Sequence, residues 1–252
     1  MWNYRFPAEY YNSIAHIYDE MYKDVYWNIA KKQIGLTIEK HISSIEGLNI
    51  IDIGGGTGYW SLWVLKKGAR VVFVEPAEKM VEQARKRISK EIGMDLRELP
   101  IEFINCSAED LDLNLRLEEN FDVVFVFGDV LSYVDNLEKA MENISRAAKK
   151  GALVFGTVDN YFSYLKDVII YGSWKYYSYL VNHRKLPIGS EYGTFEARAF
   201  EPTEIENIFK DYGFKVIELT ALASLPSVEL SIKYGKYFIL EAEHLFFVSK
   251  KF

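Results

Sequence analysis

The feature that most constrains the fold is a short apolar run that ends abruptly in glycines. Residues 48–53 read Leu-Asn-Ile-Ile-Asp-Ile, and residues 54–58 read Gly-Gly-Gly-Thr-Gly. A run of this length is typical of a buried parallel strand. Glycines directly after it allow a sharp turn and a close approach to a ligand, and the following helix offers unpaired N–H groups at its start. The segment therefore predicts a strand, a ligand-binding loop and a helix.

The chain around this loop alternates between strand and helix patterns. We expect strands at 48–53, 69–74, 101–105, 121–127, 152–157, 214–219 and 237–249. We expect helices across much of the first forty residues and at 58–67, 77–88, 136–148 and about 203–212, the last with a capping box at 203–206. This alternation predicts an α/β fold with a parallel sheet that is covered by helices on both sides.

Residues 160–200 interrupt the alternation. The stretch is dense in aromatic side chains: Tyr161, Phe162, Tyr164, Tyr171, Trp174, Tyr176, Tyr177, Tyr179, Tyr192 and Phe195. A segment this long between regular elements is usually a functional lid or an inserted subdomain. We expect a helical insertion that caps the domain.

Composition narrows the class of protein and its partners. The net charge is -6 and no basic stripe is apparent, so we expect no nucleic-acid partner. A single cysteine, Cys106, excludes a disulfide framework and a cysteine-based zinc site, and with the lack of a signal peptide it indicates a cytoplasmic protein. No apolar run is long enough to span a membrane. Frequent Lys, Glu and Ile with few prolines lean toward a thermophile.

The glycine loop discriminates between two cofactor classes. A dinucleotide fold requires Gly-x-Gly-x-x-Gly, whose third glycine would fall on Tyr59. Residues 52–58 instead follow Asp-x-Gly-x-Gly-x-Gly, which resembles motif I of the class I S-adenosylmethionine (SAM)-dependent methyltransferases. The resemblance implies that a glycine loop packs against the methionine part of SAM, here through Gly54, Gly55, Gly56 and Gly58. It also implies that Asp52 helps to place the ammonium group.

Two later segments carry the resemblance further. Glu75, followed by Pro76, lies at the end of the second expected strand, where a carboxylate can accept hydrogen bonds from both ribose hydroxyls. In the resembled family a residue placed like Met80 packs on the adenine, although Met80 could equally be a core residue. Residues 106–111 are similar to the adenine-contacting segment, so we expect Ser107, Ala108 and Glu109 there. The alternative is that Glu109 simply starts a turn.

The fourth strand and the N-terminus supply two looser matches. Residues 121–134 look like motif IV of small-molecule methyltransferases and place Phe127, Gly128 and Asp129 at the carboxyl end of a strand, where ligands of open α/β sheets bind. The Asp/Asn-Pro-Pro-Tyr/Phe signature of amino-adenine methyltransferases is absent. Residues 10–19 resemble the leading helix of small-molecule methyltransferases, which implies that Tyr11 and Tyr18 face the pocket. Simple packing is the alternative for both.

The resemblance implies a Rossmann-like, doubly wound, seven-stranded sheet of the small-molecule, UbiE-like branch. We expect one domain over 1–252, with a helical lid at 1–45 and the inserted cap at 160–200. It implies SAM as cofactor, with S-adenosylhomocysteine (SAH) as product, and a small-molecule acceptor whose methylated atom (N, O or C) is undetermined. We expect no metal and no membrane partner, and either a monomer or a homodimer.

Candidate bases are few, and one is needed only if the acceptor must lose a proton. His183 and Tyr192, in the insertion, are the two weak candidates for a catalytic role, with Glu191 weaker still. His16 is the other histidine expected near a pocket, whereas His41 and His244 are expected to be peripheral. A structural role is the more frequent alternative for a lone histidine.

Three other functions remain open from the sequence. The chain could be an RNA or protein methyltransferase, which a basic surface would indicate. It could be a SAM-binding protein without catalysis, which a plugged acceptor pocket would indicate. An NAD-dependent oxidoreductase is disfavoured by Tyr59.

Overall fold

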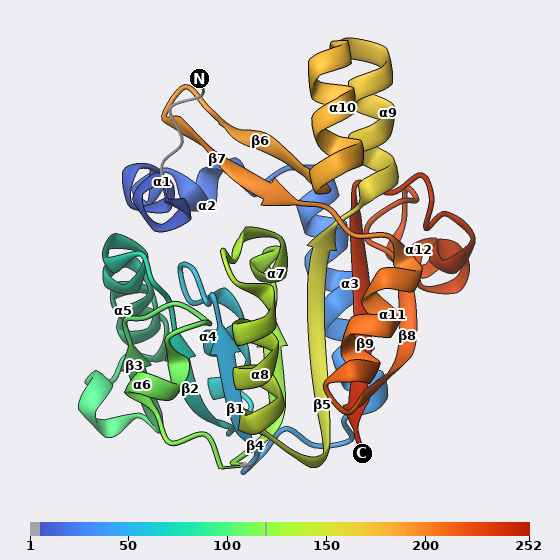
Figure 1. Cartoon of the computed structure of the whole chain (residues 1–252). Helices are drawn as coiled ribbons and strands as arrows, with labels where there is room; N and C mark the ends of the chain where they lie inside the picture. Colours follow the sequence, from blue (N-terminus) through green and yellow to red (C-terminus); the bar gives the residue numbers. More distant parts are fainter. Residues whose placement is uncertain (1–5, 119) are drawn as a thin grey trace.

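A seven-stranded sheet forms the centre of the computed structural model, which describes residues 6–118 and 120–252 (Figure 1). Its strand order is β3-β2-β1-β4-β5-β9-β8. The strands are β1 Asn49–Ile53, β2 Arg70–Val74, β3 Ile101–Ile104, β4 Phe121–Val126, β5 Ala148–Asp159, β8 Phe214–Ala221 and β9 His244–Lys251. The expected doubly wound, seven-stranded α/β fold is confirmed.

One strand of the sheet, β9, runs against the direction of the others. β1 to β5 pair in parallel, whereas β9 runs antiparallel between β5 and β8. The register pairs Asp159, the last residue of β5, with His244, the first residue of β9. Because of this reversal, the start of β9 lies at the same edge of the sheet as the carboxyl ends of the parallel strands.

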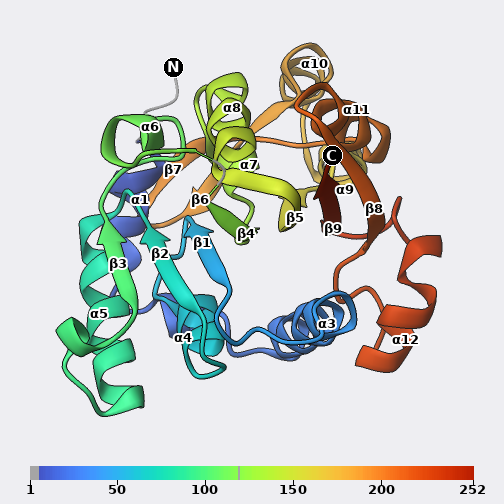
Figure 2. The ribbon, with the colours of Figure 1, turned by 90° about the horizontal axis from the view of Figure 1, so that it is seen from below.

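Helices cover both faces of the sheet (Figure 2). On one face lie α3 Val25–His41, α4 Tyr59–Leu65 and α5 Glu78–Ile92. On the other lie α6 Leu111–Asn114, α7 Val130–Tyr133, α8 Leu137–Ala147 and α11 Pro202–Asp211. Alternate residues of β1 serve the two cores: Ile50 packs with α3, α4 and α5, and Ile51 packs with α8 and α11. A central strand that is apolar on both faces is the reason the sheet can be covered twice.

Two short helices precede α3 at the edge of the sheet where the parallel strands end (Figure 1). They are α1 Pro7–Ile14, which begins at a proline, and α2 Tyr18–Met21. Asp24 caps α3 by accepting the Trp27 N–H. The expected helical character of this region is borne out for the described residues, and residues 1–5 of the proposed lid lie outside them.

The insertion is only half helical. It consists of α9 Tyr161–Tyr171 and α10 Trp174–His183, followed by an antiparallel hairpin of β6 Lys185–Ser190 and β7 Gly193–Arg198. The expectation of a helical cap is therefore wrong for its second half. Phe195 and Ala197, two residues apart in β7, are both buried, which is the period of a strand. In the sequence this pattern is hidden by the many aromatic residues of the insertion. Phe195 packs against Tyr10 and Tyr133, so the hairpin lies on α1 and α7.

Two boundaries near the C-terminus also differ from expectation. The last strand begins at His244 rather than Tyr237, because the helix α12 Val228–Tyr234 and the 3₁₀ turn Gly235–Tyr237 come before it. Helix α11 begins at Pro202, and its capping residue is Glu201, whose N–H donates to the Glu204 carboxylate at 3.4 Å. Among the described residues, no helix is both long and apolar enough to cross a membrane.

Candidate functional site

The glycine loop is pinned against the end of the neighbouring strand. The N–H groups of Gly54 and Gly55 both donate to the Val74 carbonyl, at 2.8 and 3.0 Å. Gly54 has a φ of 70°, and a Cβ on it would lie 2.2 Å from the Val130 side chain. A Cβ on Gly55 would lie 2.4 Å from the Phe73 ring. Glycine is therefore required here for both backbone conformation and space.

Glu75 is a buried carboxylate at the tip of β2. It accepts the Gly56 N–H at 3.0 Å and the Ala77 N–H at 2.9 Å, so it bridges the glycine loop and the start of α5. Burial raises the pKa of Glu75 to about 7, although these two hydrogen bonds lower it. Each carboxylate oxygen has a second lone pair, and these can still accept hydroxyl donors from a ligand.

Asp52 is buried one layer below the loop. Its carboxylate accepts the Ser61 hydroxyl at 2.6 Å, and burial raises its pKa to about 6. The side chain thus connects the end of β1 to helix α4.

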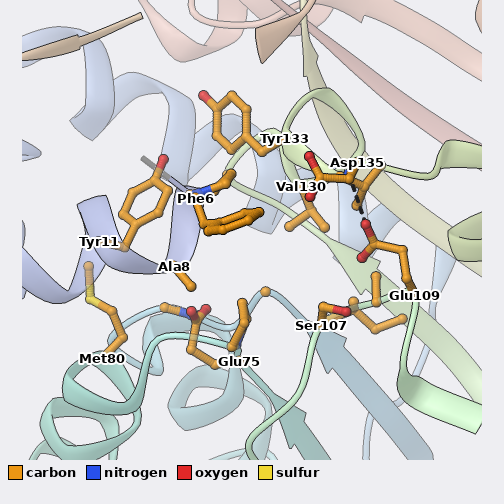
Figure 3. A pocket seen from close by; sticks show the side chains of 18 of the residues that line it. Phe6, Ala8, Tyr11, Glu75, Met80, Ser107, Glu109, Val130, Tyr133 and Asp135 are labelled. Carbon is orange, nitrogen blue, oxygen red and sulfur yellow. Dashed lines mark hydrogen bonds between the residues drawn. The ribbon is translucent and has the colours of Figure 1, made fainter. Parts of the chain in front are cut away.

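A cavity of about 430 Å³ lies beside the loop (Figure 3). Figure 3 shows Glu75 and Met80 on one side, Tyr11 and Phe6 above them, and Ser107 with Glu109 at the other end. The Glu109 carboxylate accepts the Asp135 N–H at 2.8 Å and therefore ties the end of β3 to the segment before α8. The volume lies within the range of about 300–1,000 Å³ that is usual for small-ligand pockets.

A second cavity, of about 280 Å³, lies on the other side of the loop. The two cavities share Tyr11, Tyr18, Gly54, Gly56, Gly128 and Tyr133, so they meet at the glycines. Aromatic side chains line the second cavity: Tyr22 directly after α2, Trp27 of α3, Tyr59 and Trp60 of α4, and Phe127 directly after β4. The arrangement provides one long site with an apolar inner chamber.

The N-terminal helices are fastened to the loop by a polar contact. The Thr57 hydroxyl donates to Asp19 at 2.7 Å, and Arg87 of α5 pairs with Asp19 and donates to the Thr57 hydroxyl at 2.9 Å. Helix α2 is thereby held across the mouth of the second cavity, where Tyr18 and Asp19 line it.

Three buried ionisable side chains lie together, and two of them, Asp129 and His244, line the second cavity. Asp129 follows β4, Asp159 ends β5 and His244 begins β9. The His244 Nδ1 lies 3.2 Å from Asp129 Oδ2 and 3.4 Å from Asp159 Oδ1. Burial alone would lower the pKa of His244, but the two carboxylates raise it well above its ordinary value. Burial raises the pKa of Asp159 to about 6.

Most of the residues expected to bind the cofactor line these two cavities. The first is lined by Tyr11, Tyr18, Gly54, Gly56, Glu75, Pro76, Met80, Ser107, Ala108, Glu109 and Gly128. The second adds Asp52, Gly55, Phe127 and Asp129. Gly58 has a different position: it begins α4, and a Cβ on it would lie 3.0 Å from Ala84 of α5, so it permits close helix packing.

The residues predicted as candidate bases do not line either cavity. His183 is exposed at the end of α10, with its ring 4.6 Å from that of Tyr179. Tyr192 lies in the hairpin turn near the exposed His16, with ring centroids 6.4 Å apart, and Glu191 is exposed beside it. His244, which we expected to be peripheral, is instead buried and lines the second cavity. That expectation was wrong because the antiparallel β9 turns its first residue toward the site.

Several lining residues escaped the sequence analysis. Tyr22, Trp27 and His244 line the second cavity and match no motif quoted above, and neither does Asp159, which lies beside His244. For Asp159 a signal existed, since it ends a strand that runs parallel to β4. For the others, only tertiary packing brings them to the loop.

Comparison with known proteins agrees with this geometry. Residues 50–151, from β1 through the start of β5, match the family model described as a methyltransferase domain. The glycine cradle that leaves no room for a Cβ and the buried acceptor Glu75 fit the methionine and ribose parts of SAM. Residues 50–151 therefore form a methyltransferase domain, and the site beside them fits SAM as its methyl donor.

Relatives in sequence are distant and diverse. An uncharacterised protein of Methanocaldococcus jannaschii is 25% identical over 96% of this chain and 90% of its own length. A protein arginine N-methyltransferase 6 of Danio rerio is 28% identical over 64% of this chain, and a ubiquinone biosynthesis O-methyltransferase of Dictyostelium discoideum is 23% identical over 72%. The chain spans 44% and 54% of the length of these two enzymes.

Solved structures share the fold over nearly the whole chain. A SAM-dependent methyltransferase from Clostridium acetobutylicum superposes with a TM-score of 0.63 at 16% identity, covering 96% of this chain and 98% of that one. The 1,6-didemethyltoxoflavin-N1-methyltransferase of Burkholderia thailandensis, solved with its acceptor and SAH, gives a TM-score of 0.59 at 15% identity over 97% and 90%.

Proposed function

We propose that this enzyme transfers the methyl group of SAM to a small-molecule acceptor that occupies the smaller, aromatic-lined cavity. The observation that carries the proposal is the meeting of two cavities at the glycine loop. One is large enough for an adenosyl group and is bordered by Glu75. The other is smaller and its lining is largely apolar, with Tyr18 and Asp19 of α2 at its border.

The larger cavity suits the adenosyl part of SAM. The Glu75 carboxylate would accept the two ribose hydroxyls while the Gly56 and Ala77 N–H groups hold it in place. Ser107, Ala108 and Glu109 lie where the adenine edge would fall, and Met80 would pack on its face. Tyr11 and Tyr18 close the site from above.

The methionine part would lie along the glycine loop. Gly54, Gly55 and Gly56 present bare backbone there, with Asp52 behind them. Phe127, Gly128 and Asp129 line the far side. SAM brings an activated methyl group as a sulfonium, so the protein mainly needs to hold the acceptor close and aligned.

The dimensions of the second cavity favour a small acceptor over a macromolecule. It is lined by bulky rings, among them Trp27, Trp60 and Phe127, and Asp19 fastens α2 across it. A polypeptide or RNA acceptor would require an open groove, and RNA would also favour a basic face, whereas this chain carries a net charge of -6. The relatives include both protein and small-molecule methyltransferases, so the acceptor class rests on this cavity and not on the relatives.

The surrounding segments fit roles in closing the site. In this proposal residues 1–45 act as a lid and residues 160–200 as a cap, since β7 rests on α1 and α7 through Phe195. The expected monomer or homodimer and the cytoplasmic location stay predictions.

Labelled methyl transfer tests the proposal. The purified protein is incubated with SAM that carries a radioactive methyl group and with a cell extract separated by size into small molecules, protein and RNA. We expect label in the small-molecule fraction, and loss of that label in Glu75→Ala. Glu78→Gln is the control, because Glu78 is an exposed carboxylate at the first residue of α5. Label in protein or RNA would contradict the acceptor class, and SAM binding without label in any fraction would favour a binding protein.

A further inference from the structure

The cluster of Asp129, Asp159 and His244 has the arrangement of an ion site. One potential ligand atom from each of the three lies within 4.8 Å of the others. All three residues are at most 7% exposed. Asp159 ends β5 and His244 begins the neighbouring strand β9, whereas Asp129 caps α7 directly after the loop that follows β4.

Each of the three side chains has a buried atom that is not satisfied. Asp129 Oδ1, Asp159 Oδ2 and His244 Nδ1 form no hydrogen bond with any residue that the structure describes. Buried polar atoms are nearly always paired, and each orphan implies an occupant such as an ion. Three such atoms in one buried cluster of side chains indicate a missing ligand.

The distances within the cluster also fit metal coordination. Atoms bound to one metal at about 2.1 Å lie about 3.0–3.4 Å from each other, for bond angles between 90° and tetrahedral. The His244 Nδ1 lies 3.2 Å from Asp129 Oδ2 and 3.4 Å from Asp159 Oδ1, so both distances fall in this range. A protonated Nδ1 could direct its single hydrogen at one oxygen only.

Charge leads to the same conclusion. Two carboxylates and a protonated histidine leave one uncompensated negative charge in a buried site, which is costly. A divalent cation with a neutral histidine balances the two carboxylates fully.

The backbone around the cluster is built to hold these side chains. Asp129 has a φ of 61°, a left-handed conformation that is costly for a residue other than glycine and persists only where the surroundings impose it. Its N–H donates to the Thr157 hydroxyl at 3.1 Å, and the Asp159 N–H donates to the Ser132 hydroxyl at 2.9 Å. These hydrogen bonds fix the backbone from which the two carboxylates project.

We propose that Asp129, Asp159 and His244 bind a divalent transition-metal ion at the floor of the smaller cavity. One imidazole nitrogen with two carboxylates favours Mn²⁺, Fe²⁺ or Zn²⁺ over Mg²⁺ or Ca²⁺, which prefer oxygen alone. Asp129 and His244 line the cavity, so the ion keeps positions open toward it. If the methyl transfer proposed above also holds, the ion lies where an acceptor oxygen could bind it, and it would lower the pKa of that hydroxyl.

Metal binding to the full chain, with no SAM present, tests this site. The protein is stripped of metal with a chelator, titrated with Mn²⁺ while the spin-resonance signal of the free ion is followed, and separately loaded with Zn²⁺ for elemental analysis. We expect one tight equivalent per chain and a rise in melting temperature with metal. Asp159→Asn and His244→Gln should each weaken binding by at least about tenfold and remove the rise.

Controls separate a lost ligand from a damaged fold. Glu243→Gln changes an exposed carboxylate 3.8 Å from the other ring nitrogen of His244 and should retain the metal. Metal-free Asp159→Asn should melt no lower than the metal-free parent, because it removes repulsion between two carboxylates. No metal on the folded parent, or binding that neither variant weakens, would overturn the site. A SAM titration on the same samples is independent, so failure here leaves the proposed function untouched.

Discussion

Glu75→Ala should abolish most SAM affinity. In the proposed binding mode the carboxylate accepts two ribose hydroxyls, and a hydrogen bond to a charged group contributes about 1.5–3 kcal/mol. Loss of both would cost about 3–6 kcal/mol, or a factor of about 10²–10⁴ in Kd. The Gly56 and Ala77 N–H groups also lose their acceptor, but the space left by the side chain admits water that can take its place. We therefore expect the Kd for SAM to rise by about a hundredfold, the lower end of this range.

Isothermal titration with SAM and with SAH measures this change. Glu78→Gln serves as the control, because it removes an exposed carboxylate of α5 close by. Circular dichroism and thermal melting establish that Glu75→Ala is folded. A folded Glu75→Ala protein that binds SAM as tightly as the parent would refute the assignment of Glu75 to the ribose.

Three further outcomes follow from the same geometry. Because burial raises the pKa of Glu75 to about 7, SAM affinity should fall about tenfold from pH 8 to pH 6, whereas the affinity of Glu75→Gln should stay constant over this range. The free parent should lose stability as pH rises from the unfolded value of 4.5 through 7, and Glu75→Gln should lose less, because only Asp52 and Asp159 of these buried carboxylates still titrate in it. Gly54→Ala should lower the free energy of unfolding, measured in urea, by about 2–4 kcal/mol, because its Cβ would meet Val130. The control Gly151→Ala, where φ is also positive but the space is open, should lower it by only about 1 kcal/mol, and equal losses would contradict the contact with Val130. Asp19→Ala should raise the rate constant of SAM dissociation, measured by stopped flow, with little change in the association rate constant. The control Glu20→Ala, at an exposed residue, should leave both rate constants unchanged. An unchanged dissociation rate in Asp19→Ala would show that the contact between Asp19 and Thr57 does not hold α2 over the site.

The parallel part of the sheet and its helices can be predicted from the local pattern of apolar residues and glycines. A strand such as β1, apolar on both faces and followed by glycines, has few alternatives, and helices such as α5 carry strong periodicity. The loop, Glu75 and the segment at 107–109 follow the same logic, because each comes directly after a parallel strand.

The remainder depends on contacts between distant segments. β6 and β7 form a two-stranded ribbon whose alternating burial arises from packing on α1 and α7, which the local sequence does not encode. His244 could be placed only by knowing that β9 runs antiparallel beside β5, since a parallel strand would have put its first residue at the opposite edge.

A crystal structure of the protein with bound SAH tests the central claim most directly. The account predicts that SAH spans both cavities, with its ribose hydroxyls on Glu75, its adenine at residues 107–109 and its sulfur facing the second cavity, which Asp129 lines. SAH bound elsewhere, or bound with its ribose away from Glu75, would contradict it.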